Sequence, residues 1–111
     1  MITVEALKEN GVKTEEGLGR CMNNEAFYLR LVGMALNDAN FDRLRAAVDS
    51  GDLTAAFEAA HALKGRIGNL ALTPVFEPAA EVTELLRGRA EADYAAYVRR
   101  ILEARDRLLA L

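Results

Sequence analysis

The sequence of 111 residues predicts an all-α protein, an antiparallel up-down four-helix bundle preceded by two short N-terminal helices. Leu and Ala dominate the composition, and both lose little conformational entropy in a helix. No segment alternates apolar and polar residues over the length of a strand between turn signals. Short loops join the longer helical segments, and an up-down bundle is the simplest packing for such a chain.

Two short helices are expected at the N-terminus. Thr3 is placed to cap the first, which runs to Glu9 and is ended by Gly11. Thr14 starts the second helix, because the two glutamates that follow it interact favourably with the partial positive charge of a helix N-terminus.

The next segment is expected to form either two helices or one long helix with a bend. Asn24 caps the first part, which runs to about Asp38. The residues on its inner side are Phe27, Tyr28, Leu31, Val32 and Ala35. Asn40 caps the second part, which runs from Phe41 to Ser50. Its apolar residues Phe41, Leu44 and Val48 keep the i, i+3, i+7 spacing of one helix face.

The second long helix is bounded by clear signals. Gly51 closes the preceding segment, and Asp52 caps a helix from Leu53 to about Leu70. At about 100° per residue, one side of this helix should face the core. The residues on that side are Leu53, Ala56, Ala60, Leu63, Ile67 and Leu70.

Two more helices complete the expected bundle. Thr73 offers a capping hydroxyl before Pro74 at the first helical position, and this helix stops at Gly88. Its inward residues are Val75, Ala79, Val82 and Leu86. Pro78 would remove a backbone hydrogen bond inside the helix, unless the helix starts properly at Glu77. The last helix, about Ala90 to Ala110, buries Tyr94, Val98, Ile101 and Leu108.

The composition and charge argue against nucleic-acid binding, disulfides and metal sites. The net charge of −3 is mild and the basic residues are scattered, so nucleic acid is not an expected partner. A single cysteine, Cys21, excludes an intramolecular disulfide and should be a small buried apolar residue. With one histidine and one cysteine, no metal site is expected.

The sequence also predicts the location of the protein and its domain organisation. No stretch reaches the 18 or so apolar residues of a membrane span, and no signal-peptide layout is present, so a cytoplasmic location without a membrane partner is expected. The chain contains no linker or internal repeat. We expect a single domain over residues 1–111, with its bundle core at about 24–111.

His61 is the residue that stands out, within the stretch AAHALKGRIGNL. It falls off the core-facing side of its helix, so its imidazole should be solvent-accessible. Gly65 and Gly68 follow in the same strip, although each costs about 1 kcal/mol relative to Ala inside a helix. The expected compensation is clearance for a convex partner surface that approaches the imidazole. Lys64 adds a flexible positive charge one turn from His61.

These residue types point to phosphoryl transfer. A neutral imidazole is a competent nucleophile near neutral pH, and Lys64 lies where a phosphoryl group would need a cation. No base or oxyanion hole is evident near His61. A carrier has no need of one, because the partner supplies Mg²⁺ and electrostatic stabilisation.

The pattern H-x-L-K-G-x-x-x-N-L resembles the histidine-containing phosphotransfer (HPt) domains of two-component phosphorelays. It is formed here by His61, Leu63, Lys64, Gly65, Asn69 and Leu70. The resemblance implies that His61 is phosphorylated and that Lys64 neutralises the phosphoryl charge. The sequence leaves the imidazole nitrogen open, and the resemblance favours the outer one, Nε2. It also implies that a receiver domain docks around His61. The residues expected to take part in docking are Phe57, Glu58, Ala62, Gly65, Gly68 and Asn69.

The implied function is that of a phosphorelay intermediate. A sensor histidine kinase or a receiver aspartate would donate the phosphoryl group, and a response-regulator receiver domain would accept it. No nucleotide-binding glycine loop is present, so the protein is expected to be a phosphocarrier and not an enzyme. It needs no cofactor of its own, since Mg²⁺ belongs to the receiver. We expect a monomer, because the functional helix face must stay free.

Three positions depart from the family pattern. Arg66 is bulky where a small residue is frequent, although it should point away from His61. Ala71 replaces a glycine that is common just after the motif. On the following helix, relatives often place a glutamine or an acidic group opposite the histidine, and Thr83 or Glu84 occupies that place here.

Other interpretations stay open at this point. The chain could be an interaction module that binds and sequesters a receiver or another helical protein without transfer. A helical ligand binder or metal protein is a third interpretation, for which the pair Glu58 and His61 supplies only two ligands. Gly65 could serve helix packing, and Asn69 could simply end its helix. The aromatic residues Phe27, Tyr28, Phe41, Phe57, Tyr94 and Tyr97 are expected in the core.

Overall fold

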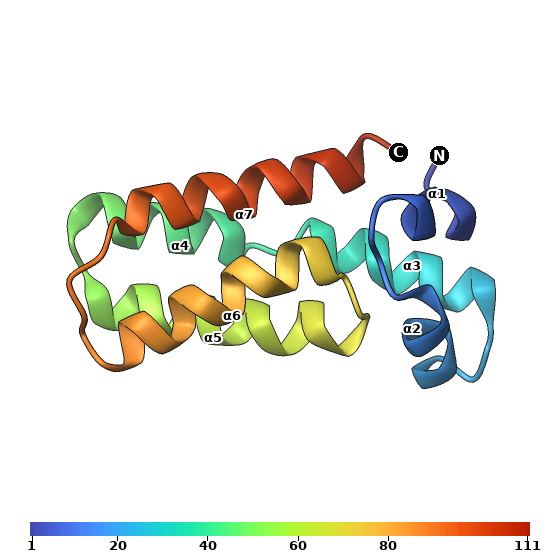
Figure 1. Ribbon diagram of the computed structural model, residues 1–111, viewed down its shortest axis with the longest axis horizontal. Coiled ribbons are helices and arrows are strands. Elements are labelled where there is room, and N and C mark those ends of the chain that lie inside the picture. Colours follow the sequence, from blue (N-terminus) through green and yellow to red (C-terminus); the bar gives the residue numbers. More distant parts are fainter.

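The computed structural model describes residues 1–111 and contains seven helices and no strand, so the all-α prediction is confirmed (Figure 1). The helices are α1 (Val4–Glu9), α2 (Thr14–Arg20), α3 (Glu25–Leu36), α4 (Asn40–Ser50), α5 (Leu53–Asn69), α6 (Thr73–Arg87) and α7 (Tyr94–Leu109). The molecule is elongated, with principal extents of 40 × 23 × 20 Å.

The four helices α4 to α7 pack side by side. Each contacts the next along the chain, consecutive helices run in opposite directions, and α7 also contacts α4 (Figure 1). This packing is consistent with the expected four-helix bundle. Helix α3 precedes α4 and contacts α5 and α7. Helices α1 and α2 lie at the end of the molecule where α5 ends and α6 begins (Figure 1).

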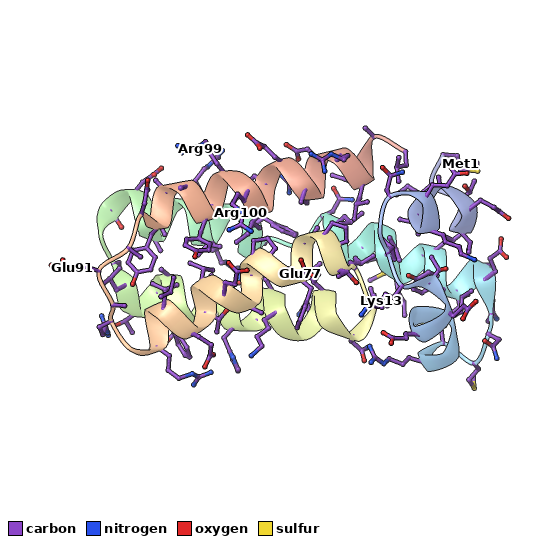
Figure 2. The ribbon with its side chains drawn as sticks, viewed as in Figure 1. Met1, Lys13, Glu77, Glu91, Arg99 and Arg100 are labelled. Carbon is purple, nitrogen blue, oxygen red and sulfur yellow. The ribbon has the colours of Figure 1, made fainter.

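The core is continuous along the bundle. Its largest fully buried side chains are Tyr28, Phe41, Leu7, Leu36, Leu44, Leu63, Ile67, Leu72, Leu86, Ile101, Leu108 and Val32. The inward residues predicted for α6 are all buried, and so is Cys21. Charged side chains such as Glu91 and Arg99 point away from the bundle (Figure 2).

Several residues predicted to be buried are not. Phe27 is 43% exposed, because α3 extends beyond the bundle and only one side of it is covered. Leu31, Val48, Leu53, Phe57, Tyr94 and Tyr97 are half-buried at the edges of the core. Since helix contacts in this bundle are narrow, the outer positions of each predicted apolar face stay partly in solvent.

Three of the predicted N-caps are confirmed. The side chains of Thr3, Asn24 and Asp52 accept hydrogen bonds of 3.0 to 3.1 Å from the backbone amide three residues later. Gly51 ends α4 with a φ of +75°, as expected of a glycine cap. Asp93 was not predicted, and it caps α7, which therefore begins at Tyr94 and not near Ala90.

The predicted start of α2 at Thr14 is confirmed. The caps predicted at Asn40 and Thr73 are wrong, because each of these residues is the first of its helix and neither caps it with its side chain. At α4, the Asp38 carboxylate accepts from the Asn40 amide at 2.7 Å instead. The Thr73 hydroxyl donates backwards to the Ala71 carbonyl at 3.2 Å.

Pro78 lies within α6 and is buried. The alternative start at Glu77 is therefore wrong, because the helix is continuous from Thr73 to Arg87. Proline has no backbone N–H, so one hydrogen bond of the helix is absent at this turn.

The turn between α5 and α6 has the hydrogen bonds of a Schellman motif. The Ala71 amide donates to the Gly68 carbonyl at 3.1 Å, and the Leu72 amide donates to Ile67 at 3.2 Å. Ala71 is the residue in the left-handed conformation, with a φ of +58°. A glycine is the ordinary residue at this position, which gives a physical reason for the glycine that the resemblance leads one to expect there.

The N-terminal segment holds this turn. The Tyr28 hydroxyl donates to the Leu70 carbonyl at 2.9 Å, and the Lys13 amide donates to Ala71 at 3.2 Å. Gly17 lies against the same place, since a Cβ added to it would be 2.7 Å from the Leu70 carbonyl and would overlap the Tyr28 ring. The end of the helix that carries His61 is thus fixed from outside the bundle.

Candidate functional site

His61 lies exposed on the middle of α5, as the sequence predicts. Its imidazole stacks on the ring of Phe57, one turn earlier on the same helix, with centroids 5.6 Å apart and planes 11° apart. Ring nitrogens lie in the plane of the imidazole, so a stack on one face leaves them accessible at its edge. The Phe57 ring is in turn covered by Arg87 of α6, whose Cζ lies 5.0 Å from the ring centroid.

A second group of charges lies beside this stack. Lys64 Nζ is 3.9 Å from Glu84 Oε2, and the same oxygen is 3.3 Å from Arg87 Nε. The three side chains are partly or largely exposed, so each pair is a surface ion pair. Nothing in the sequence pattern pointed to Arg87. Its position follows from the contact between α5 and α6.

Thr83 and Glu84, the two residues predicted for the position on α6 opposite His61, have different surroundings. Glu84 faces α5 and contacts Lys64. Thr83 is fully buried, and its hydroxyl donates to the Ala79 carbonyl at 2.6 Å. Of the two, only Glu84 presents a polar group to the side of α5 that carries Lys64.

The two glycines of the strip also differ. A Cβ added to Gly65 would meet no atom within 4 Å, so the surface above it is open and helix packing does not require a glycine there. A Cβ added to Gly68 would lie 2.8 and 2.9 Å from two ring carbons of Phe76. The expected clearance at Gly68 is therefore wrong, because the missing side chain makes room for Phe76 of α6.

The remaining predicted docking residues lie at different heights along α5. Glu58 is exposed, Ala62 is half-buried, and Asn69 is exposed at the last position of the helix. Arg66 turns towards the connection between α3 and α4, where its Nη1 lies 2.6 Å from the Asp38 carboxylate. This carboxylate is only 3% exposed, which makes the contact more sheltered than the other ion pairs.

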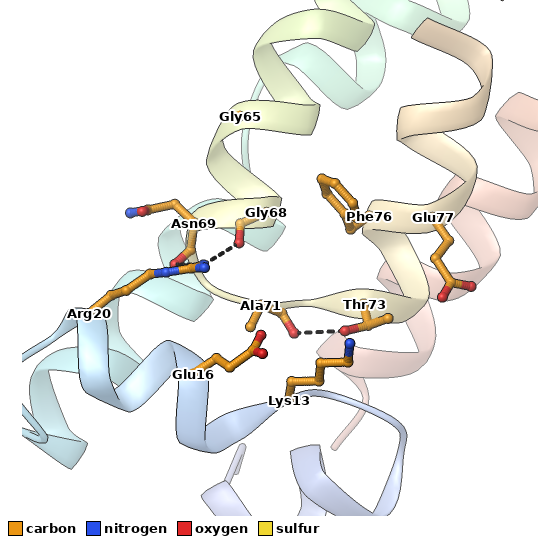
Figure 3. A pocket seen from close by; sticks show the side chains of 10 residues that line it. All are labelled: Lys13, Glu16, Arg20, Gly65, Gly68, Asn69, Ala71, Thr73, Phe76 and Glu77. Atoms are coloured by element: carbon orange, nitrogen blue, oxygen red, sulfur yellow. Dashed lines mark hydrogen bonds between the residues drawn. The ribbon is translucent and has the colours of Figure 1, made fainter. Parts of the chain in front are cut away.

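A groove of about 670 Å³ opens beside Gly65 and was not predicted (Figure 3). It lies between α2, the end of α5 and the start of α6, and its lining residues are Lys13, Glu16, Arg20, Gly65, Gly68, Asn69, Ala71, Thr73, Phe76 and Glu77. Arg20 crosses it to donate from Nη1 to the carbonyls of Gly68 at 2.7 Å and Asn69 at 3.1 Å (Figure 3). A cation thus caps the C-terminus of α5, where the helix dipole favours positive charge.

No group of three His, Cys, Asp or Glu side chains converges in a way that could hold a metal ion. None of the seven helices combines the length and the apolar character needed to cross a membrane.

Comparison with known proteins identifies the family. The family model described as the Hpt domain matches residues 34–111, which include α4 to α7 and His61. Neither the curated proteins nor the solved structures contain a match. Hpt domains serve histidine phosphotransfer in two-component signalling, interact with receiver domains and kinases, and are phosphocarriers and not enzymes. Since the match covers more than half of the chain, this protein belongs to the Hpt domain family.

Proposed function

We propose that His61 is the residue that carries the phosphoryl group. The observation that carries the proposal is the exposure of the only histidine of the chain, on a helix within the matched residues. Lys64, one turn further along α5, would neutralise phosphoryl charge, and the open surface above Gly65 would admit the partner. We propose residues 1–111 as one four-helix-bundle unit that acts as a monomer.

The reaction follows from these groups. An unprotonated imidazole nitrogen attacks the phosphorus of a receiver aspartyl phosphate. The P–N bond forms while the bond between phosphorus and the aspartyl oxygen breaks, and the aspartate leaves as a carboxylate. Transfer onwards to another receiver aspartate is the reverse reaction. Mg²⁺ and most of the stabilisation of the transition state would come from the receiver.

The partner would dock on the surface around His61. The proposed contacts are the predicted docking residues that remain accessible beside it, Phe57, Glu58, Ala62, Gly65 and Asn69. The donor would be a sensor histidine kinase or a receiver, and the acceptor a response-regulator receiver domain. Gly68 would contribute to this surface only through the backbone, since Phe76 covers its side-chain position.

A test uses a receiver domain phosphorylated with acetyl phosphate as the donor. The protein should acquire one phosphoryl group that is labile in acid and stable in base, and His61→Gln should abolish it. An interaction module without transfer would instead bind the receiver equally well with His61→Gln and would never form the adduct. That result would refute the proposed carrier.

A further inference from the structure

Glu84 occupies a position between two cations of the site. Its Oε2 lies 3.9 Å from Lys64 Nζ and 3.3 Å from Arg87 Nε, so one carboxylate oxygen serves both side chains. Lys64 belongs to α5 and Arg87 to α6, which makes Glu84 the anion that links the two helices beside His61. The lysine proposed to neutralise the phosphoryl group therefore already has an anionic partner.

The ion pair between Lys64 and Glu84 is weak enough for Lys64 to exchange Glu84 for another anion. The lysine side chain is 34% exposed and the carboxylate 59%, and exposed pairs of this kind are weak. Their separation of 3.9 Å is at the long end of the range for an ion pair. A phosphoryl group carries about 1.5 to 2 negative charges near pH 7, more than a carboxylate. Because residues three apart are neighbours on a helix, Lys64 reaches the surroundings of His61 by rotation of its own side chain.

We propose that Glu84 is a placeholder for the phosphoryl group, and this inference rests on the proposed function of His61. In the free protein Glu84 holds Lys64. When His61 is phosphorylated, Lys64 moves from Glu84 to the phosphoryl oxygens, and Glu84 keeps its contact with Arg87. Glu84 thereby competes with the phosphoryl group for Lys64, which shortens the lifetime of the phosphohistidine and keeps the group easy to transfer.

The lifetime of the adduct measures this competition. In hydrolysis, water attacks phosphorus, the P–N bond breaks, and imidazole and inorganic phosphate are released. Phosphoramidate can serve as the donor, so that no receiver is present, and intact-mass spectrometry can follow the loss of the adduct after the donor is removed. Glu84→Gln keeps the size of the side chain and removes its charge. We expect the adduct of this variant to last about two- to fivefold longer than that of the unaltered protein, as the strength of an exposed ion pair allows.

Glu81→Gln is a matched control on the same helix. Glu81 is 52% exposed and pairs with Arg100 of α7 at 3.4 Å, so it lies on the side of α6 that faces α7. Its replacement makes the same change in net charge but leaves Lys64 and Arg87 untouched. The lifetime should stay that of the unaltered protein. An equal lengthening with Glu81→Gln would show a general effect of charge and would overturn the inference.

Lys64→Ala provides the decisive comparison. If Glu84 acts through Lys64, then Glu84→Gln has no effect on the lifetime when Lys64 is already replaced. A lengthening that persists in the double variant would mean direct repulsion between Glu84 and the phosphoryl group, and would refute the placeholder role. A normal adduct with no effect of Glu84→Gln also refutes it, while leaving the proposed function intact. Failure of the unaltered protein to form any adduct with either phosphoramidate or a phosphorylated receiver would overturn both.

Discussion

Phe57 and His61 form a parallel ring stack on one face of α5, with 5.6 Å between the ring centroids. The two residues are four apart, which places them one turn from each other on the helix surface. The stack restricts rotation of the imidazole, and the contact of Arg87 with the Phe57 ring ties its position to α6. The orientation of the proposed nucleophile thus depends on packing between two helices.

Replacement of Phe57 should alter both the spectrum and the reactivity of His61. Phe57→Leu removes the aromatic ring, so the ring protons of His61 should lose their ring-current shift and the rate of phosphoryl acceptance should fall several-fold. Phe57→Tyr keeps the ring and should preserve both. Proton NMR resolves this readily, because the chain has a single histidine. Unchanged acceptance in a Phe57→Leu variant that has lost the shift would show that the stack has no role in positioning.

The two glycines of α5 should respond in opposite ways to alanine. Gly68→Ala places a Cβ 2.8 Å from Phe76 and should destabilise the protein by about 1 to 3 kcal/mol. Gly65→Ala meets open space and should stabilise the helix by up to about 1 kcal/mol. Urea unfolding measures both changes. Gly65→Ala should nonetheless slow transfer from a phosphorylated receiver, since the methyl group stands where the partner approaches. Transfer at the unaltered rate would argue against clearance at Gly65.

Ala71→Gly should stabilise the fold by about 1 kcal/mol, because the residue sits at a φ of +58° where alanine is strained. Ala46→Gly is a suitable control. Ala46 is exposed in the interior of α4, where glycine should instead destabilise the helix by about 1 kcal/mol. The midpoints of urea unfolding distinguish the two substitutions. A loss of stability with Ala71→Gly would show that the turn does not hold the strain assigned to it.

Tyr28 makes stability depend on alkaline pH. Burial raises the pKa of its phenol to about 12, and the nearby Cys21 adds to the shift. In the unfolded chain the phenol ionises near pH 10. The contribution to stability is therefore complete below pH 10 and is lost as the pH rises from 10 to 12, by about 2 to 3 kcal/mol. Tyr28→Phe should flatten this part of the pH profile, although it also removes the hydrogen bond to Leu70. An unchanged profile in the variant would contradict the assignment.

Local sequence patterns were sufficient to predict the helical segments and the exposure of His61. The angle between residues on one helix depends only on their spacing, so the exposure of His61 could be worked out from α5 alone. The surroundings of Gly68 could not, since the ring that covers it comes from Phe76 on another helix. The choice between Thr83 and Glu84 could not be made from the local pattern either. Successive side chains of a helix point about 100° apart, and Pro78 left the start of that helix ambiguous.

The wrong cap at Asn40 has a related reason. A cap is the residue just before the first helical backbone angles, and at α4 that residue is Ala39, whose side chain cannot accept a hydrogen bond. Asp38 bonds the Asn40 amide instead, and its other oxygen binds Arg66 of α5. That contact with a distant helix is invisible in a local pattern. The sequence therefore predicts which segments are helical better than it predicts their first residues.

The turn after α5 shows that the segment needed to hold the fold extends further than the segment that matches the family model. The family match begins at residue 34, but the groups that bond the carbonyls of Gly68, Asn69, Leu70 and Ala71 come from Arg20, Tyr28 and Lys13. A fragment or chimaera cut at the family boundary would lose these hydrogen bonds, and the turn at the left-handed Ala71 would keep only the hydrogen bonds from its own segment. Anyone who transplants this His61 helix into another protein must therefore carry the N-terminal segment with it.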